Sequence, residues 1–384
     1  MSSTTRRISL AAAAALTGSL TIGMGAFAAP STPYQDDADY AWTHFATNDG
    51  NKNLYRVAGT DRVATAIKLM NATSKHWSDT VIIARSDNFA DALASAPLVD
   101  VKDAPLLVSA PGSSIDSRVL SAIKYRFHKV ILLGGTGVFT EAARAQLEGL
   151  GMFVTRMRGI DRYETAVGIA KVVANDLAMR YRAEGWTFKK TVNVYLATGL
   201  AFPDAMGAGA AAADNDGVVL LTAGSKMSAS TYKFLKKEWK TIPWFANGIE
   251  IHTVGGAAEK AAKSSIEDIA DTNTGADRYA TAVMLANKFK HPVKKIAVAS
   301  GETYADGVTA GAWIANHDGP LVLTANASLP KVVSNYLFKF ADGGADVVVV
   351  GGTGSVSRNV SAQIATLFAL CPLMPQGRSH PEKG

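Results

Sequence analysis

The sequence predicts an α/β protein built from three tandem copies of one Rossmann-like parallel-sheet unit. Two observations predict this class: phrases that recur in a fixed order, and an alternation of short apolar runs with amphipathic segments in every copy. The first phrase is Gly-x-Asp-Arg, found as GTDRVATAI from Gly59, GIDRYETAV from Gly159 and GADRYATAV from Gly275. A single large domain with chance echoes is the alternative, and the shared order of the phrases argues against it.

Two further phrases complete each copy. An aromatic-x-Asp phrase follows the first, as FADALASA from Phe89, FPDAMGAGA from Phe202 and YADGVTAGA from Tyr304. An apolar run that ends in Gly-Gly comes third, as VILLGGTG, IHTVGGAA and VVVVGGTG. The copies are therefore about a hundred residues long, a common domain size.

The first copy shows the order of elements that the others repeat. Its apolar runs are short and lack alternation, as in strands buried on both faces of a parallel sheet, and single helical patterns separate them. Helices are expected over 63–70, 90–99, 117–127 and 140–150, and strands over 81–85, 104–110 and 129–135. Equivalent strands are expected over 192–198, 217–223, 249–254, 295–300, 319–325 and 345–350.

The two ends of the chain differ from the repeats. Arg6 and Arg7, an uncharged apolar stretch and small residues before Ala28 predict a secretory signal peptide with cleavage after Ala28. The alternative, a retained membrane helix, is disfavoured because the apolar stretch is short and interrupted by glycine. The predicted organisation is a signal peptide 1–28, an acidic arm 29–54, repeat units 55–152, 153–270 and 271–370, and an unstructured tail 371–384.

Composition limits the chemistry. The formal charge of +6 falls to +4 without the leader, which removes two arginines and no acid. The single cysteine, Cys371, cannot form an internal disulfide, so the core must hold the fold. The sequence has no H-E-x-x-H, no G-x-S-x-G and no cysteine pair, so no catalytic residue, metal or cofactor is predicted. The Gly-Gly turns also fail the dinucleotide fingerprint, at Thr140 and at Ser357, and are interpreted as tight turns between strand and helix.

The Gly-x-Asp-Arg phrase supplies the main candidate site residues. Asp61, Asp161 and Asp277 stand where helices begin, so N-capping is the favoured interpretation. Glu164, three residues after Asp161, adds a capping-box pattern. An arginine in the first turn faces the positive end of the helix dipole, so it requires an acidic partner or an anionic ligand. Both possibilities are open for Arg62, Arg162 and Arg278.

The aromatic-x-Asp phrase supplies secondary candidates. Asp91, Asp204 and Asp306 follow a strand and precede a helix rich in small residues. This position is the carboxyl edge of a parallel sheet, where open α/β folds bind ligands. N-capping is the simpler interpretation for these residues too.

The three phrases together resemble the cell wall-binding repeat 2 family of Gram-positive bacteria, from about Tyr55 to Leu367. The resemblance implies three Rossmann-like units around a pseudo-threefold axis, in exported proteins held non-covalently to anionic wall polymers. It implicates the three arginines and the aspartate before each. It also implicates apolar triplets near the repeat junctions, within which the candidates are Leu106, Leu107, Leu220, Leu221, Leu321 and Leu323.

The expected function is therefore that of a secreted, non-catalytic protein that attaches to an anionic polysaccharide or teichoic-acid-like polymer at the cell surface. Three weak sites on one frame gain avidity for a repetitive target. Neither nucleic acid nor, after signal cleavage, a membrane span is expected. One alternative is an exported glycan hydrolase that uses Asp91, Asp204 or Asp306 as acid or base, although such enzymes need one spaced carboxylate pair rather than three copies. Another is an interaction protein whose acidic arm recruits a partner.

Overall fold

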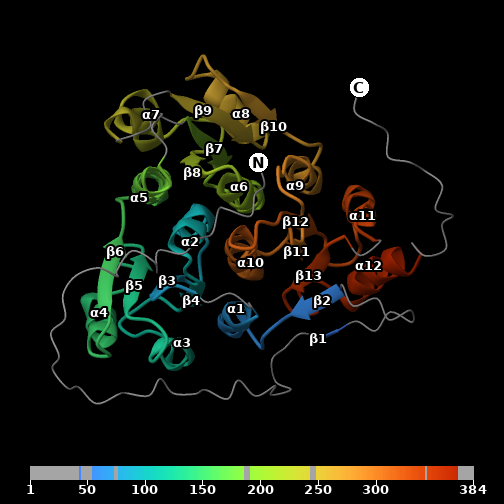
Figure 1. Ribbon diagram of the computed structural model, residues 1–384, viewed down its shortest axis with the longest axis horizontal. Coiled ribbons are helices and arrows are strands. Elements are labelled where there is room, and N and C mark those ends of the chain that lie inside the picture. Colours follow the sequence, from blue (N-terminus) through green and yellow to red (C-terminus); the bar gives the residue numbers. More distant parts are fainter. Residues whose placement is uncertain are drawn as a thin grey trace. The chain divides into compact units, whose positions relative to one another are not determined.

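The computed structural model describes residues 43–44, 54–72, 77–185, 191–242, 248–341 and 344–370. The described chain is α/β, with three sheets of four parallel strands that alternate with helices (Figure 1). The predicted signal peptide, nearly all of the acidic arm, the tail and Cys371 lie outside the described residues. No helix in the described ranges combines the length and apolar character that a membrane crossing requires.

The three sheets share one strand order. The first is β4 (Leu106–Ser109), β3 (Thr80–Arg85), β5 (Lys129–Leu133) and β6 (Phe153–Met157). The second is β8 (Gly217–Thr222), β7 (Val192–Thr198), β9 (Ile249–Val254) and β10 (Asp271–Asn273). The third is β12 (Leu321–Thr324), β11 (Lys295–Ser300), β13 (Asp346–Val350) and β2 (Leu54–Val57), with β1 (Thr43–His44) antiparallel to β2.

The last strand of each sheet comes from the next sequence copy. β6 pairs with β5, β10 pairs with β9, and β2, which opens the first copy, pairs with β13 of the third. The sheets are thus offset by one strand from the repeat units drawn on the sequence at 55–152, 153–270 and 271–370. Because the first and last copies share a sheet, the three units close around a pseudo-threefold axis.

Central helices join the copies. α2 (Ala96–Lys102), α6 (Pro203–Asp214) and α10 (Ala305–Ala315) contact one another pairwise and lie at the centre of Figure 1. A Cβ added at Gly209 would lie 2.8 Å from the Cβ of Ala96, and one at Gly311 would lie 3.3 Å from the carbonyl oxygen of Met206. The small residues that follow the aromatic-x-Asp phrase therefore let helices of different copies pack closely.

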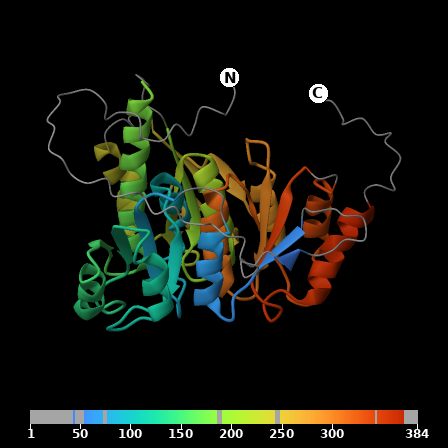
Figure 2. The same cartoon turned by 60° about the horizontal axis from the view of Figure 1, so that its bottom comes forward.

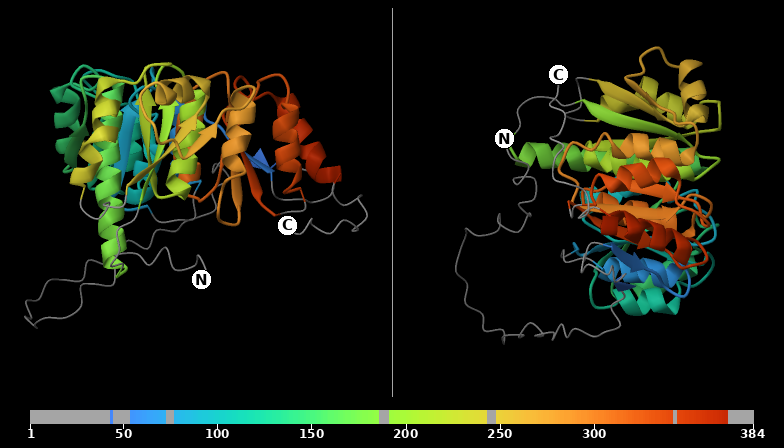
Figure 3. Two further views of the ribbon diagram at one scale, coloured as in Figure 1. Left: turned by 90° about the horizontal axis from the view of Figure 1, so that it is seen from above. Right: turned by 90° about the vertical axis from the view of Figure 1, so that its right-hand side faces the viewer.

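Helices α1 (Arg62–Asn71), α5 (Arg162–Ala183) and α9 (Arg278–Ala286) follow the shared strands and pack on β4, β8 and β12. Figure 2 shows α1 between the first and third sheets. α5 has 22 residues, against 10 in α1 and 9 in α9, and projects beyond the other helices (Figure 3). The remaining elements are α3 (Ser117–Ile123), α4 (Glu141–Glu148), α7 (Ala229–Lys236), α8 (Gly256–Lys263), α11 (Lys331–Phe338), α12 (Arg358–Leu370) and the 3₁₀ helix η3 (Glu238–Thr241).

Candidate functional site

The Gly-x-Asp-Arg phrase begins the helices α1, α5 and α9, and its aspartates are N-caps as predicted. Each carboxylate accepts a hydrogen bond from the backbone N–H three residues on, at 2.8 to 2.9 Å. The Glu164 carboxylate accepts from the N–H of Ile160 at 2.7 Å, one residue before the position that a capping box would use. All three capping aspartates, Asp61, Asp161 and Asp277, are exposed.

A buried threonine extends this phrase, and it was missed in the sequence. The hydroxyls of Thr65, Thr165 and Thr281 accept hydrogen bonds of 3.0 to 3.1 Å from the phrase's glycine N–H. A Cβ on each of these glycines would lie 2.4 Å from the threonine nitrogen, so only glycine fits there. The visible signal was a threonine four residues after the aspartate in every copy.

The three arginines make the same contact in their own copies. Through Nη1, Arg162 donates to the Gly199 carbonyl at 2.6 Å and Arg278 donates to the Gly301 carbonyl at 2.5 Å. Arg62 donates through Nη1 to the equivalent carbonyl, that of Ser86. The contact requires a close approach, because a Cβ on Gly199 would lie 3.1 Å from the Cδ of Arg162.

The other edge of each guanidinium has no partner among the described residues. The hydrogen bonds of Arg62, Arg162 and Arg278 all leave from Nη1, and none of the three forms an ion pair with any described residue. Arg62 and Arg162 are half-buried and Arg278 is exposed. The Nε and Nη2 donors, which form the side-on fork that grips carboxylate or phosphate, are therefore available to an external anion.

The aromatic residues of the second phrase meet one another. The ring centroids of Phe89, Phe202 and Tyr304 lie 5.4 to 6.1 Å apart. The guanidinium carbon of Arg62 lies 5.4 Å from the centre of the Tyr304 ring, and that of Arg162 lies 5.8 Å from the centre of the Phe89 ring. Each ring belongs to the copy that precedes its arginine, so these cation–π contacts bridge neighbouring copies. These aromatic residues were visible in the repeated phrase, but the sequence alone predicted no role for them.

The aspartates of the second phrase are not caps, so the capping interpretation was wrong for them. The N-caps of α2, α6 and α10 are Ser95, Phe202 and Tyr304, and none makes a side-chain capping bond. The side chains of Asp91, Asp204 and Asp306 instead lie within the electrostatic reach of the arginine of the following copy, which is Arg162, Arg278 and Arg62 respectively.

Burial dominates the acidity of these carboxyls. It raises the pKa of Asp204 to about 6, while the positive charge of Arg278 acts in the opposite direction. Burial also raises the pKa of Asp91 and of Asp306, and hydroxyl groups of Thr165 and Ser355 partly offset the effect. The Ser355 hydroxyl donates to Asp306 at 3.2 Å.

The Gly-Gly turns are tight, as predicted, and they accommodate these carboxylates. The first glycine of each turn has a positive φ, of 110°, 79° and 111° in the three copies. A Cβ there would lie 3.1, 2.0 or 2.6 Å from a carboxylate oxygen of the same copy's aspartate. These glycines are Gly134, Gly255 and Gly351, and the aspartates are Asp91, Asp204 and Asp306.

Each junction thus places one arginine near the half-buried or buried aspartate of the preceding copy. At the junctions of Arg62 and Arg162, the arginine also lies over an aromatic ring of that copy. At the junction of the second and third copies, Asp204, Gly255, Asp277 and Arg278 line a cavity of about 250 Å³. Across the described ranges, no group of three or more His, Cys, Asp or Glu side chains is placed to hold a metal ion.

The leucine candidates do not reach the surface. Leu106, Leu107, Leu220, Leu221, Leu321 and Leu323 lie on β4, β8 and β12 and are at most 6% exposed. A polymer outside the protein could not touch them in this conformation. The expectation that these leucines contact the polymer directly is therefore wrong. Leu221 and Leu323 instead support the site from inside the fold, because they pack behind Gly199 and Gly301, whose carbonyls hold the arginines.

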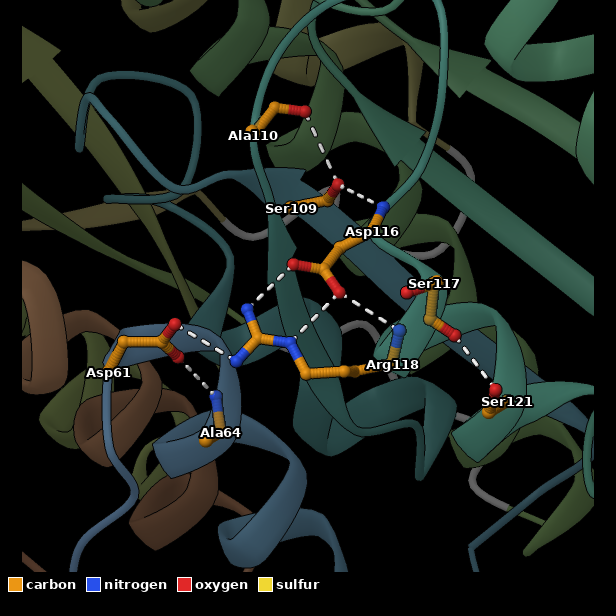
Figure 4. Close-up of polar contacts among 8 residues, drawn as sticks. All are labelled: Asp61, Ala64, Ser109, Ala110, Asp116, Ser117, Arg118 and Ser121. Carbon is orange, nitrogen blue, oxygen red and sulfur yellow. Dashed lines mark hydrogen bonds and ion pairs between the residues drawn. The ribbon is translucent and has the colours of Figure 1, made fainter.

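The first copy has an additional ion-pair network. Arg118 on α3 donates to Asp61 at 2.9 Å and to Asp116 at 2.7 Å, and the Asp116 N–H donates to Ser109 (Figure 4). No described residue forms an ion pair with Asp161 or Asp277. The three capping aspartates share their backbone bond but differ in their side-chain surroundings.

The fold and the junctions together define a class: threefold-repeated parallel α/β proteins with cationic groups at the contacts between copies. Within this class, the chain belongs to the family Cell wall binding domain 2 (CWB2), whose profile matches residues 56–144, 156–263 and 273–361. The resemblance inferred from the sequence is confirmed.

Two curated relatives from Bacillus subtilis are longer than this chain. The chain is 24% identical over 325 residues to N-acetylmuramoyl-L-alanine amidase LytC of Bacillus subtilis, covering 82% of this chain and 58% of the relative. It is 25% identical over 333 residues to the Amidase enhancer of the same organism, covering 82% and 41%. The chain thus spans about half the length of these relatives.

Solved structures share the fold. Cwp6 from Clostridium difficile matches with a TM-score of 0.67 and 23% identity, covering 82% of this chain and 48% of that one. Cwp8 from the same organism matches with a TM-score of 0.65 and 24% identity, covering 83% and 52%. At this identity the likeness establishes the fold alone.

Proposed function

We propose that this protein is a secreted, non-catalytic wall-binding protein that attaches to an anionic glycopolymer through Arg62, Arg162 and Arg278. Membership of the cell wall binding family associates the chain with the wall. The predicted leader over 1–28 supports export.

One observation carries the proposal: the free Nε and Nη2 edge of a guanidinium recurs at all three junctions. Each arginine is held by a backbone carbonyl through Nη1, so its remaining donors are preorganised for a bidentate anion. Guanidinium stays charged at any physiological pH. Three such groups on one rigid frame would bind a polymer with repeated charges more tightly than a single charge.

The test is cosedimentation of the mature protein with purified cell envelopes, before and after chemical removal of the acidic polymers. Changing all three arginines to alanine should abolish retention, and changing them to lysine should weaken it, because lysine keeps the charge but loses the fork. Retention should also fall with added salt, since the Debye length is about 10 Å at 0.1 M. The control variant removes three exposed cations elsewhere, at Arg126, Lys260 and Lys263, and should keep full retention.

Three outcomes would contradict the proposal. Full retention on stripped envelopes would exclude the acidic polymer as the ligand. Release of soluble sugar would favour the hydrolase alternative. If the triple alanine variant unfolds, as judged by its melting curve, the arginines hold the copies together and the assignment to binding is wrong.

A further inference from the structure

The three arginine junctions are not equivalent, because two neighbouring positions vary among the copies. The residue after the carbonyl that accepts each arginine is Asp87, Leu200 or Glu302. The variable residue of Gly-x-Asp-Arg is Thr60, Ile160 or Ala276. Large aliphatic side chains therefore occupy both positions only around Arg162.

These two aliphatic side chains are in water. Leu200 is 62% exposed and Ile160 is 97% exposed, which places both among the few large exposed hydrophobic residues of the described chain. Single exposed apolar side chains are ordinary. Here, however, Ile160 lies two residues before Arg162, and Leu200 directly follows the glycine whose carbonyl accepts from Arg162, so both positions flank the same half-free guanidinium. Arg162 also lies over the Phe89 ring, which belongs to the aromatic cluster.

The other two junctions have a carboxylate where Leu200 stands. Asp87 is held by Arg85 through two bonds of 2.7 and 2.8 Å, and these bonds, with a contribution from the charge of Arg62, lower its pKa. Glu302 acts on Tyr279, the residue next to Arg278, and with burial it raises the pKa of that phenol. An incoming anion would meet a carboxylate at both places: Asp87 is already paired with Arg85, whereas Glu302 forms no ion pair with any described residue.

The charged groups around Arg162 are arranged differently. Asp91 faces it from the preceding copy, and its charge is offset by both Arg85 and Arg162. Asp161, the N-cap of α5, and Glu164, in its first turn, accept hydrogen bonds from backbone N–H groups. Glu164 also lies near Lys233. No carboxylate stands at the position of Leu200.

We infer that the Arg162 junction is the principal contact of the protein, and that it takes an anionic sugar with an acyl group or an apolar ring face beside its charge. The inference rests on the proposed function and deepens it. The guanidinium of Arg162 binds the anion, while Leu200 and Ile160 cover the adjacent apolar surface of the ligand. The junctions of Arg62 and Arg278 contribute less and add avidity.

Single substitutions test the ranking, with affinity for the purified acidic wall polymer as the readout. Arg162→Ala should weaken binding by about tenfold or more, the loss of one charge-assisted contact, whereas Arg62→Ala and Arg278→Ala should each weaken it by about threefold or less. Equal losses at the three arginines would overturn this inference and leave the proposed function intact. No loss at any of them would overturn both.

Exchanges between copies test the apolar part. Leu200→Glu, the residue of the third copy, should weaken binding nearly as much as Arg162→Ala, and Ile160→Thr, the residue of the first, should weaken it less. The double change of Leu200 and Ile160 to Ala should weaken binding to the wall polymer but leave binding to dextran sulfate, a hydrophilic polyanion, unchanged. Tyr125→Ala, at a site 85% exposed, is the matched control.

The double alanine variant should have the same melting temperature as the wild type, because both side chains are largely exposed. The inference fails if this variant binds the wall polymer as tightly as the wild type does. It also fails if the variant loses affinity for the wall polymer and for dextran sulfate equally, because the apolar contact is then absent.

Discussion

Each copy of the repeat carries two aspartates near the starts of two helices, and the two sets have different surroundings. Asp61, Asp161 and Asp277 are exposed and cap their own helices. Asp91, Asp204 and Asp306 cap nothing, lie against a Gly-Gly turn and face the arginine of the next copy. The difference shows that one set serves local helix formation, whereas the other belongs to the junction between copies.

The largest expected effect comes from filling the space that a junction aspartate, Asp204, occupies beside its Gly-Gly turn. Gly255 has φ 79° and ψ 150°, a conformation that is essentially restricted to glycine, and a Cβ there would lie 2.0 Å from an Asp204 oxygen. Gly255→Ala should therefore lower the free energy of unfolding by about 3 kcal/mol or more, measured by urea denaturation.

The neighbouring glycine provides the control. A Cβ on Gly256 would lie no closer than 3.6 Å to Thr274, and its φ is not in the left-handed region, so Gly256→Ala should change stability little. Similar losses of unfolding free energy for both variants would mean that the turn itself requires glycine, and that the carboxylate packed on it does not impose this requirement.

A smaller effect should appear in the pH dependence of stability. Because the pKa of Asp204 is about 6 in the folded state and 3.8 ordinarily, the folded protein binds this proton more tightly than the unfolded chain. Lowering the pH from 7 through 6 toward 4 should thus stabilise the wild type relative to Asp204→Asn, by about 2 kcal/mol in total. Denaturation of both proteins at several pH values measures the difference.

A carboxyl held in an ion pair should give the opposite sign. Hydrogen bonds from Arg118 lower the pKa of Asp116, so the stability contributed by that group is present above the ordinary pKa and is lost as pH falls below it. Relative to Asp116→Asn, the wild type should therefore lose stability at the acid end. Parallel pH profiles for the wild type and Asp204→Asn would show that the surroundings of Asp204 do not raise its pKa.

The sequence was sufficient for the fold because local patterns determine it. Apolar runs without alternation predicted the parallel strands that lie between the first and the third phrase of each copy. Residues 192–198, for example, form β7 as expected. It was insufficient for the sheet boundaries, because the pairing of β2 with β13 joins residues nearly 300 positions apart. No local pattern encodes such a contact.

The site was predicted in part, for the same reason. The caps Asp61, Asp161 and Asp277 depend on bonds within one helical turn, so their residue type and position were enough. The environment of Asp91, Asp204 and Asp306 comes partly from another copy, and a capping carboxylate and a junction carboxylate look alike in sequence. The buried leucines were wrongly expected to contact the polymer. The sequence does not distinguish a strand buried near a junction from a strand exposed on the surface of that junction.

The smallest expected effect belongs to the exposed set. Asp161→Ala removes bonds of 2.9 and 2.8 Å to the N–H groups of Tyr163 and Glu164, so the free energy of unfolding should fall by about 1 kcal/mol. Asp161→Asn should restore most of this loss, because an asparagine side chain caps equally well. Polymer binding should be retained in both variants, since Arg162 is held by the Gly199 carbonyl and not by Asp161. If Asp161→Ala instead abolished binding while Asp161→Asn also failed to restore it, the carboxylate would act on the ligand, and the division between a capping set and a junction set would not hold.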